Sequence, residues 1–321
     1  MLPILKFNPY FKSVIWGGDR IAAFKGLPSQ GNDIGESWEL SPMPGHESVV
    51  AEGEFRGQTL NDLCKKYPVE ILGGKVDAKW HGNFPLLVKF IDSNDDLSIQ
   101  VHPDDALAKE RHNSLGKTEM WYSVEPAEGA YLYAGFSREM NPDLFRQMIA
   151  DNTIVSALGK FFVKPGDVFF LPAGRVHAIG KGNFLVEIQE ASDITYRIYD
   201  YDRRDAKGNP RELHVEQSVG AVNYNDVGQE AKNVTPKAGE NLVVEKCEYF
   251  TTDAVALDGK TTLDLAALDS FTILIGIGGD LKVTDSEGRT TALPAGQTLL
   301  VPACIPSVTI EGTGKLLTVN L

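Results

Sequence analysis

Cysteine is scarce in this chain, whose 321 residues include only Cys64, Cys247 and Cys304. These three lie far apart and form no CxxC pair. A small domain held together by disulfides needs an even number of cysteines at closer spacing, so that class of protein is excluded. The pattern indicates a reducing cytoplasm, and we expect three free, buried thiols without a chemical role.

Basic residues are also few relative to acidic ones. Lys and Arg number 31 and Asp and Glu number 44, which gives a formal net charge of −13. Nucleic acids and anionic membranes bind basic surfaces, so neither is expected as a partner. A small anionic substrate stays compatible with this charge, because charges on a distant surface are screened within about 8 Å.

Long hydrophobic runs are absent as well. No stretch of about 18 apolar residues occurs that would cross a membrane. The first residues lack the basic stretch and apolar core of a signal peptide. Hydrophobic residues nevertheless make up 42% of the chain and charged residues 23%, as in a typical globular protein. We therefore expect a soluble cytoplasmic protein.

Short apolar segments, separated by Gly, Pro, Asn or Asp, predict a mainly β fold. The clearest strands are expected at 84–91, 97–101, 120–124 and 130–133. Helices are few, and capping residues or helical spacing predict them at 59–66, 104–112, 141–149 and 212–224. A polar segment at 225–241 is the candidate linker before a last, strand-rich region.

An internal repeat relates two parts of this pattern. Residues 165–177 (PGDVFFLPAGRVH) and 295–307 (AGQTLLVPACIPS) match at a constant offset of 130 positions. Each copy predicts a turn with Gly, a buried strand and a Pro-Ala turn that reverses the chain. His177 ends the first copy, whereas Ser307 stands at this position in the second. Metal chemistry is therefore expected in the first copy alone.

Four side chains with nitrogen or oxygen donors form a candidate metal site. Gln100 and His102 lie two residues apart in a predicted strand and therefore share one face. Glu119 lies in another alternating segment, and His177 ends the repeat turn. This donor set suits Zn²⁺, and one carboxylate with three neutral ligands leaves a net charge of about +1. Such a site can stabilise an oxyanion or an enediolate by Lewis-acid catalysis.

Iron is the chemical alternative at this site. Two His and one carboxylate also form the ligand set of non-haem iron enzymes. The additional Gln100 and the basic residues described next favour zinc.

Three basic side chains stand out in this acidic chain. Lys89 interrupts an apolar strand, where an unpaired ammonium group is costly to bury. Lys117 is expected on the same face as the nearby glutamate, and Arg197 lies in a segment rich in aromatic and charged residues. Together with a metal they would bind a phosphate dianion. The simpler alternatives are an edge-strand Lys89 that reaches solvent and an Arg197 that forms an ion pair with Asp193 or Asp200.

The motifs around these residues resemble one known family. Type I mannose-6-phosphate isomerases are similar to this chain in LSIQVHPDD (97–105), GKTEMWY (116–122), PAGRVHAIGKG (172–182) and EASDITYRIYDYDRR (190–204). The shorter bacterial branch of these cupin-fold zinc enzymes is similar also in FPLLVKFID (84–92), an early WGG and GESWELS (35–41). The resemblance covers nearly the whole chain.

The resemblance implies roles for particular residues. One zinc ion per chain would be held by Gln100, His102, Glu119 and His177. Arg197 would act near the reacting carbons of the substrate. Ser98, Lys89 and Lys117 would border the substrate pocket, where the two lysines and Ser98 hold the phosphate.

The resemblance also implies the fold and the partners. We expect two cupin-like (jelly-roll) β-sandwich or barrel domains, with a few short helices inserted in the N-terminal part. Residues 1–240 would form the catalytic metal-binding domain, and residues 241–321 a C-terminal cupin-like domain without metal ligands. The expected partner is a small sugar phosphate, and the expected oligomeric state is a monomer or a weak homodimer.

The implied reaction interconverts mannose 6-phosphate and fructose 6-phosphate. A proton moves between C2 and C1 through a cis-enediol, which requires a base and a group that stabilises the enediolate. Glu187, Lys117 and a zinc-bound water are the candidate bases. Two alternatives stay open: a non-enzymatic cupin that binds a sugar or a metal, and an iron-dependent cupin oxygenase.

Overall fold

The computed structural model describes residues 1–204, 208–228 and 230–321, and within them strands predominate over short helices. The predicted mainly β fold class is confirmed. The chain divides into two compact units: the first comprises Met1–Lys12, Asp19–Phe90 and Val234–Leu321, and the second Ser13–Gly18 and Ile91–Asn233. The predicted domains, 1–240 and 241–321, divide the chain between the two copies of the repeat, whereas the two units are defined by contacts in space. The predicted division stays a prediction.

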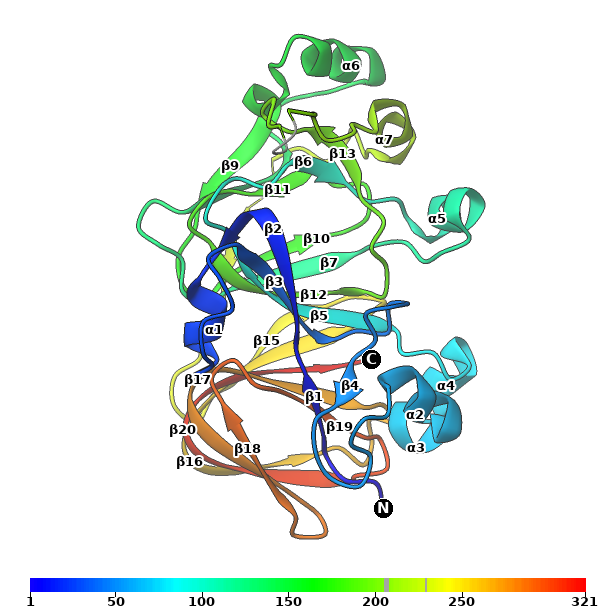
Figure 1. Cartoon of the computed structure of the whole chain (residues 1–321), viewed down its shortest axis with the longest axis vertical. Helices are drawn as coiled ribbons and strands as arrows, with labels where there is room; N and C mark the ends of the chain where they lie inside the picture. Colours follow the sequence, from blue (N-terminus) through cyan, green and yellow to red (C-terminus); the bar gives the residue numbers. More distant parts are fainter. Residues whose placement is uncertain (205–207, 229) are drawn as a thin grey trace. The chain divides into compact units, whose positions relative to one another are not determined.

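The second unit contains two layers of β-strands. One layer is a five-stranded sheet in the order β13-β6-β11-β8-β9 (Figure 1). Its strands are β6 (Ile99–Val101), β8 (Tyr131–Phe136), β9 (Leu158–Phe162), β11 (His177–Ile179) and β13 (Tyr196–Tyr199). The other layer, in the order β14-β10-β7-β12, contains β7 (Glu119–Ser123), β10 (Asp167–Leu171), β12 (Phe184–Glu190) and β14 (Lys232–Asn233).

Each face of the five-stranded sheet packs on an apolar cluster. One cluster joins it to the other layer, with buried members Trp121, Leu132, Ala134, Phe169, Leu171, Ile179 and Leu185 among others. The second cluster joins its opposite face to α6 (Pro142–Ala150), η1 (Ile154–Ala157) and α7 (Val215–Ala221). Ile99 and Val101 belong to this second cluster. Since strand side chains alternate, Gln100 between them points into the space between the two β layers.

Side-chain caps place three helices where the sequence predicted them. In α2 (Leu60–Lys66), α5 (Asp105–His112) and α6, the capping residues Thr59, Asp104 and Asn141 each accept a hydrogen bond from a backbone N–H in the first turn. The helix predicted at 212–224 is shorter, because the backbone N–H of His214 bonds to Arg197 and α7 begins only at Val215. The remaining helices are α1 (Arg20–Phe24), α3 (Pro68–Leu72) and α4 (Gly74–Trp80).

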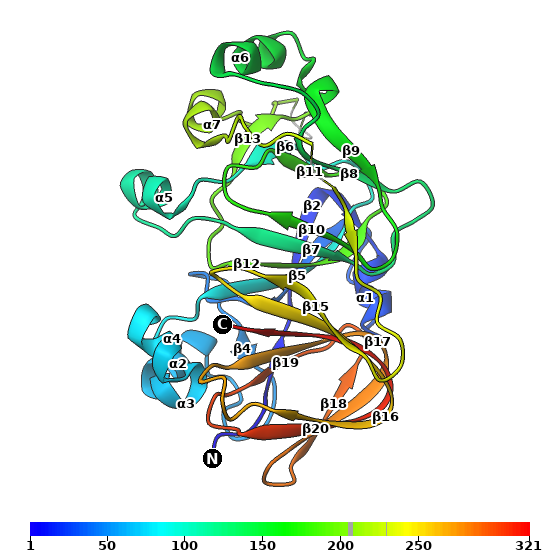
Figure 2. The same ribbon diagram turned by 180° about the vertical axis from the view of Figure 1, so that it is seen from behind.

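In the first unit, a large sheet runs in the order β15-β16-β20-β17-β19-β1-β4, with β18 beside β17 (Figure 2). The prediction of a strand-rich last region is confirmed. Its strands are β15 (Asn241–Lys246), β16 (Thr251–Asp264), β17 (Thr272–Asp285), β18 (Thr290–Pro294), β19 (Thr298–Val301) and β20 (Ser307–Asn320). They join β1 (Leu5–Asn8) and β4 (Val49–Val50) over a core of aliphatic side chains. The other N-terminal strands are β2 (Tyr10–Gly18), β3 (Ile34–Leu40) and β5 (Leu86–Asp92).

The two copies of the sequence repeat adopt the same turns. Gly166 and Gly296 precede β10 and β19 with φ of 80° and 79°, which a side chain would disfavour. After each strand, the carbonyl oxygen of the proline accepts a hydrogen bond from the backbone N–H three residues later. The nitrogen–oxygen distance is 3.1 Å at Pro172 and 3.0 Å at Pro302. The repeat is therefore structural as well as sequential.

The candidate linker and the cysteines differ in part from expectation. Of the predicted linker 225–241, residue 229 lies outside the described residues, and the rest includes the short strand β14. All three cysteines are free, and burial raises the pKa of the Cys64 thiol to about 12. Cys247 and Cys304 are partly exposed, so the expected burial is wrong for these two. Among the described residues no helix is long and apolar enough to cross a membrane.

Candidate metal and substrate site

Three predicted site residues form a row across the five-stranded sheet. His177 in β11 is paired with Gln100 in β6, and Gln100 is paired with Arg197 in β13. Residues directly opposite each other in antiparallel strands project from the same face. His102 follows β6 two positions after Gln100. The row therefore brings side chains that are far apart in the sequence to one side of the sheet.

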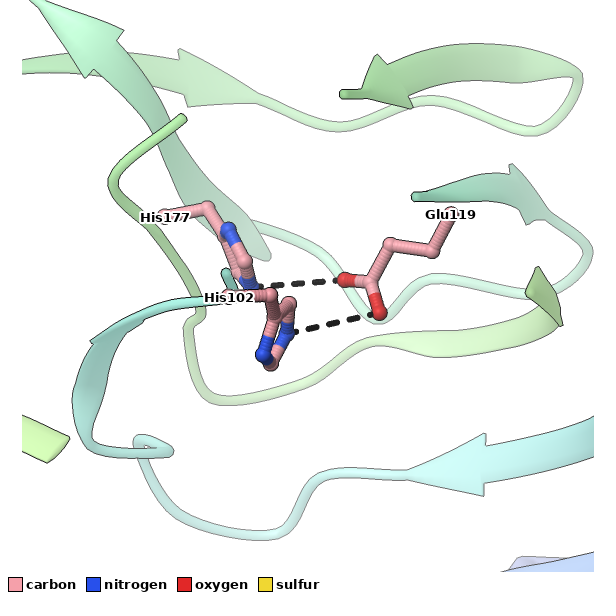
Figure 3. Close-up of side chains that lie close together, drawn as sticks. All are labelled: His102, Glu119 and His177. Carbon is pink, nitrogen blue, oxygen red and sulfur yellow. Dashed lines mark ion pairs between the residues drawn. The ribbon is translucent and has the colours of Figure 1, made fainter. Parts of the chain in front are cut away.

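Glu119, at the start of β7 in the other layer, faces the two histidines (Figure 3). Its carboxylate oxygens lie 3.5 Å from Nε2 of His102 and 3.3 Å from Nε2 of His177. All three side chains are buried, and one potential ligand atom from each lies within 4.8 Å of the others. The predicted metal residues His102, Glu119 and His177 therefore form a group that could hold a metal ion.

The hydrogen bonds behind the histidines suit a metal ion. Nδ1 of His102 lies 2.9 Å from the carbonyl oxygen of Ile194, and Nδ1 of His177 lies 2.9 Å from that of Arg175. A carbonyl oxygen accepts only, so each proton is on Nδ1 and each Nε2 carries the lone pair with which a histidine binds a metal. Burial lowers the pKa of His177 to about 3, which keeps its ring in the neutral form that binds metals.

Gln100 lies at the edge of this group. Its side-chain amide nitrogen is 3.3 Å from Nε2 of His177. Because the His177 ring carries its proton on Nδ1, its Nε2 atom accepts a hydrogen bond from this amide N–H. Rotating the amide by about 180° places its oxygen at this position, where it can act as a fourth ligand.

Lys117 supplies a buried positive charge next to the same group. Its Nζ atom lies 2.7 Å from a carboxylate oxygen of Glu119 and 3.1 Å from Nε2 of His102. The alternation of the GKTEMWY segment predicted that Lys117 and Glu119 would share a face, and the two are in contact. The ammonium group is placed to exchange a proton or to bind an anionic oxygen in this pocket.

Glu187 reaches the histidine group through an aromatic ring. Its carboxylate accepts a hydrogen bond of 2.9 Å from Nε1 of Trp121. The Trp121 ring packs edge-on against the ring of His177, with centroids 5.4 Å apart. Trp121 was not among the predicted site residues, although strand alternation places it on the same face as Glu119. Glu187 is buried and its negative charge acts on His177, which raises the pKa of that ring against the larger effect of burial.

Arg197 has main-chain and side-chain partners from one later segment. Nη1 of Arg197 donates to the carbonyl oxygen of Glu212 at 2.8 Å, and its backbone N–H donates to Nδ1 of His214. Burial lowers the pKa of Arg197, and the charge of Arg211 lowers it further. The alternative ion pair with Asp200 is not found among the described contacts, because Asp200 binds Arg203 and Arg211.

The two remaining predicted substrate residues lie in different units. Ser98 is buried in the second unit, two positions before Gln100. Lys89 belongs to the first unit, where its Nζ atom lies 3.6 Å from a carboxylate oxygen of Glu36 and 5.3 Å from the ring centre of Trp38. Lys89 is 4% exposed, so the alternative of a lysine that reaches solvent is wrong.

Comparison with known proteins gives one consistent family. Residues 4–129 match the model of the type I phosphomannose isomerase catalytic domain, and residues 240–321 match the mannose-6-phosphate isomerase cupin domain. Mannose-6-phosphate isomerase of Streptococcus mutans is 36% identical over 93% of this chain and 92% of its own. Mannose-6-phosphate isomerase ManA of Bacillus subtilis is 34% identical over 99% and 98%. A crystal structure of mannose 6-phosphate isomerase from Bacillus subtilis superposes over the whole of both chains with a TM-score of 0.90 and 33% identity.

Proposed function

This chain belongs to the type I mannose-6-phosphate isomerase family, and we propose that it interconverts mannose 6-phosphate and fructose 6-phosphate. The observation that supports this most is the convergence of His102, Glu119 and His177 in one buried group, next to the ammonium group of Lys117. A buried site with these ligands and a cation suits the transfer of a proton beside a sugar carbonyl.

We propose zinc as the metal, one ion per chain, with Gln100, His102, Glu119 and His177 as ligands. Two neutral imidazoles, one carboxylate and an amide oxygen suit Zn²⁺ and leave a charge of about +1 on the site. When bound, zinc supplies Lewis-acid polarisation of the sugar oxygens. The carbonyl oxygens behind both histidines support this assignment, because they hold the rings with Nε2 available.

The catalytic residues are proposed to be Arg197, Lys117 and Glu187. Ring opening gives the aldehyde, and transfer of a proton from C2 to C1 through a cis-enediol gives the ketose. The guanidinium group of Arg197 would stabilise the negative charge that develops on the enediolate oxygens. Lys117 and Glu187 are the candidate groups that carry the proton, because both are buried and contact ligand side chains directly or through one ring.

The substrate phosphate is proposed to bind through Ser98, Lys89 and Lys117, with Arg197 completing the set of substrate-binding residues. Two ammonium groups and a hydroxyl match the charge and the hydrogen-bond acceptors of a phosphate dianion. Lys89 already balances the carboxylate of Glu36 within the first unit.

The protein is proposed to be cytoplasmic and to be a monomer or a weak homodimer. A cytoplasmic location agrees with the three free cysteines, which a reducing compartment keeps unpaired. We retain the monomer or weak homodimer, and the domains 1–240 and 241–321, as parts of this proposal.

A coupled assay and metal analysis test the function together. Purified protein should convert mannose 6-phosphate to fructose 6-phosphate and contain about one zinc ion per chain. Binding of the sugar phosphate without turnover would instead support a non-enzymatic cupin. Bound iron together with oxygen consumption would support a cupin oxygenase that uses the two histidines and Glu119.

A further inference from the structure

A short segment of the second unit holds Arg197 at both its main chain and its side chain. The backbone N–H of Arg197 donates to Nδ1 of His214 at 3.1 Å, and the backbone N–H of His214 donates to the carbonyl oxygen of Arg197 at 2.7 Å. Nη1 of Arg197 donates to the carbonyl oxygen of Glu212 at 2.8 Å. We call residues 208–214 the return segment, because they bring the chain back to β13.

The return segment is anchored by an ion-pair cluster around the buried carboxylate of Asp200. Nε of Arg211 donates to a carboxylate oxygen of Asp200 at 2.7 Å, and Nη2 of Arg211 also contacts this carboxylate. Arg203 donates to Asp200 at 2.6 Å. Burial would raise the pKa of Asp200, but these hydrogen bonds and charges outweigh burial and leave the pKa below its usual value. Asp200, three residues after Arg197, therefore stays charged and holds both Arg203 and Arg211.

The guanidinium group of Arg197 keeps one donor for another molecule. Its Nε–H is buried and has no hydrogen-bond partner among the described residues. A buried donor without a partner costs free energy, so such a group in a native protein calls for an explanation. Arg197 lies directly opposite Gln100, in the row of site residues. A substrate oxygen that accepts from Nε would complete its hydrogen bonds.

We propose that His214 is a positioning residue, which together with the Glu212 carbonyl orients Arg197 toward the substrate. This inference rests on the proposed function, because it assigns His214 a role through Arg197. In the contact with the Arg197 backbone N–H, the Nδ1 atom of His214 is the acceptor. A misplacement of a catalytic group by about 1 Å can lower a rate about 100-fold.

Substitutions of His214 test whether the acceptor at Nδ1 matters. His214→Ala removes it and is expected to lower kcat about 10-fold to 100-fold, with little change in KM. His214→Asn places an amide oxygen near the position of Nδ1 and is expected to restore most of kcat. Should the alanine variant lose structure, His214→Gln replaces it, because its amide extends beyond Nδ1. The matched control is Glu216→Ala, an exposed side chain in α7, which should leave kcat unchanged.

A double-mutant cycle separates positioning from a general structural effect. In the Arg197→Ala background, His214→Ala is expected to have no further effect on kcat, because His214 acts through Arg197. An equal loss of kcat in both backgrounds would overturn the inference. So would an alanine variant of His214 with the kcat of the wild type.

A crystal structure of the His214→Ala variant tests the inference without any activity. Arg197 is expected to leave the Glu212 carbonyl in this variant and to keep it in His214→Asn. An Arg197 that stays in place in both variants would overturn the inference even if the protein is an active isomerase. Wild-type protein without isomerase activity, but with the expected movement of Arg197, would overturn the proposed function alone.

Discussion

The two copies of the repeat have the same turns but carry different side chains at the positions of the candidate metal-binding group. In the first copy, β10 pairs with β7 so that Leu171 lies opposite Glu119. At the equivalent place in the second copy, β19 pairs with β17 and Val301 lies opposite Thr272. His177 corresponds to Ser307 by the offset of 130 residues. The glycine turn, the strand and the proline turn thus give both copies the same backbone. The capacity to bind a metal depends on a few side chains placed on that backbone.

The strand that carries Gln100 and its counterpart in the second copy show the same contrast. Gln100 is paired with His177 in the first copy, and Asp264 is paired with Ser307 in the second. The second copy therefore offers Asp264, Thr272 and Ser307, of which Asp264 is exposed. This set contains no imidazole, and a single exposed carboxylate binds a metal weakly. The second copy keeps the architecture and lacks the donors.

The largest effect is expected from removing a ligand of the first copy. His102→Ala should abolish bound zinc and turnover, because the remaining donors leave the ion incompletely coordinated. Metal analysis and the coupled assay measure both. Ser307→His is the matched control, which should add no second metal ion. A His102→Ala variant that stays fully active after chelator treatment would show that the metal assignment is wrong.

A smaller effect is expected from Arg197, which lies in the row of site residues but is not a ligand. Arg197→Ala should keep one metal ion per chain and lower kcat about 100-fold to 1000-fold, the usual loss when a group that stabilises an oxyanion is removed. Metal content and steady-state kinetics give the two readouts. Unchanged kinetics would remove Arg197 from the mechanism.

Substitution in the core of the second copy should affect stability alone. Leu299 is fully buried in the aliphatic cluster of the first unit. Leu299→Ala should lower the free energy of unfolding by about 2–5 kcal/mol through the lost contacts and the cavity. The kcat of the folded enzyme at low temperature should not change. Leu242→Ala, at a side chain 37% exposed, is the control and should stay within about 0.5 kcal/mol. A Leu299→Ala variant that is fully folded but has lost its metal ion would contradict the prediction that this substitution affects stability alone.

The smallest effect concerns a buried carboxyl group beside the first copy's ligands. Glu190 accepts a hydrogen bond of 2.7 Å from the backbone N–H of Thr118, and burial raises its pKa to about 8. A folded-state pKa above the unfolded value stabilises the protein at low pH, and this contribution is lost as the pH rises toward 8. Denaturant unfolding should therefore show wild type losing stability from pH 5 to pH 8 relative to Glu190→Gln. Parallel pH profiles for both proteins would contradict the raised pKa.

Strand alternation and the repeat were enough to predict much of the candidate site. Gln100 and His102 were placed on one face by the period of two, and Lys117 was placed beside Glu119 by the same rule. These inferences depend on neighbours within a few residues, where backbone geometry fixes the direction of each side chain. The repeat similarly located His177 at the end of a turn.

Contacts between segments far apart in the sequence could not be predicted from strand alternation or from the repeat. The sequence pattern predicted a helix over 212–224, whereas in the structure Glu212 and His214 precede α7 and both accept hydrogen bonds from Arg197. An ion pair of Arg197 with Asp193 or Asp200 was the alternative to a catalytic role, but Asp200 binds Arg211 and Arg203. Several arginines and aspartates follow β13 closely, and their spacing is compatible with more than one set of ion pairs.

By itself the amino-acid sequence determined the β-rich architecture and the duplicated turns, and it singled out His102, Glu119 and His177 as a group that could hold a metal ion. Local alternation, glycine conformation and proline turns act over a few residues and are therefore readable from order alone. Only the tertiary structure decided that three segments meet with both Nε2 atoms facing Glu119, and which partner each arginine takes. Those outcomes depend on strand register and burial, which bring together residues as distant as His102 and Ile194, 92 positions apart, and no local rule selects among such pairings.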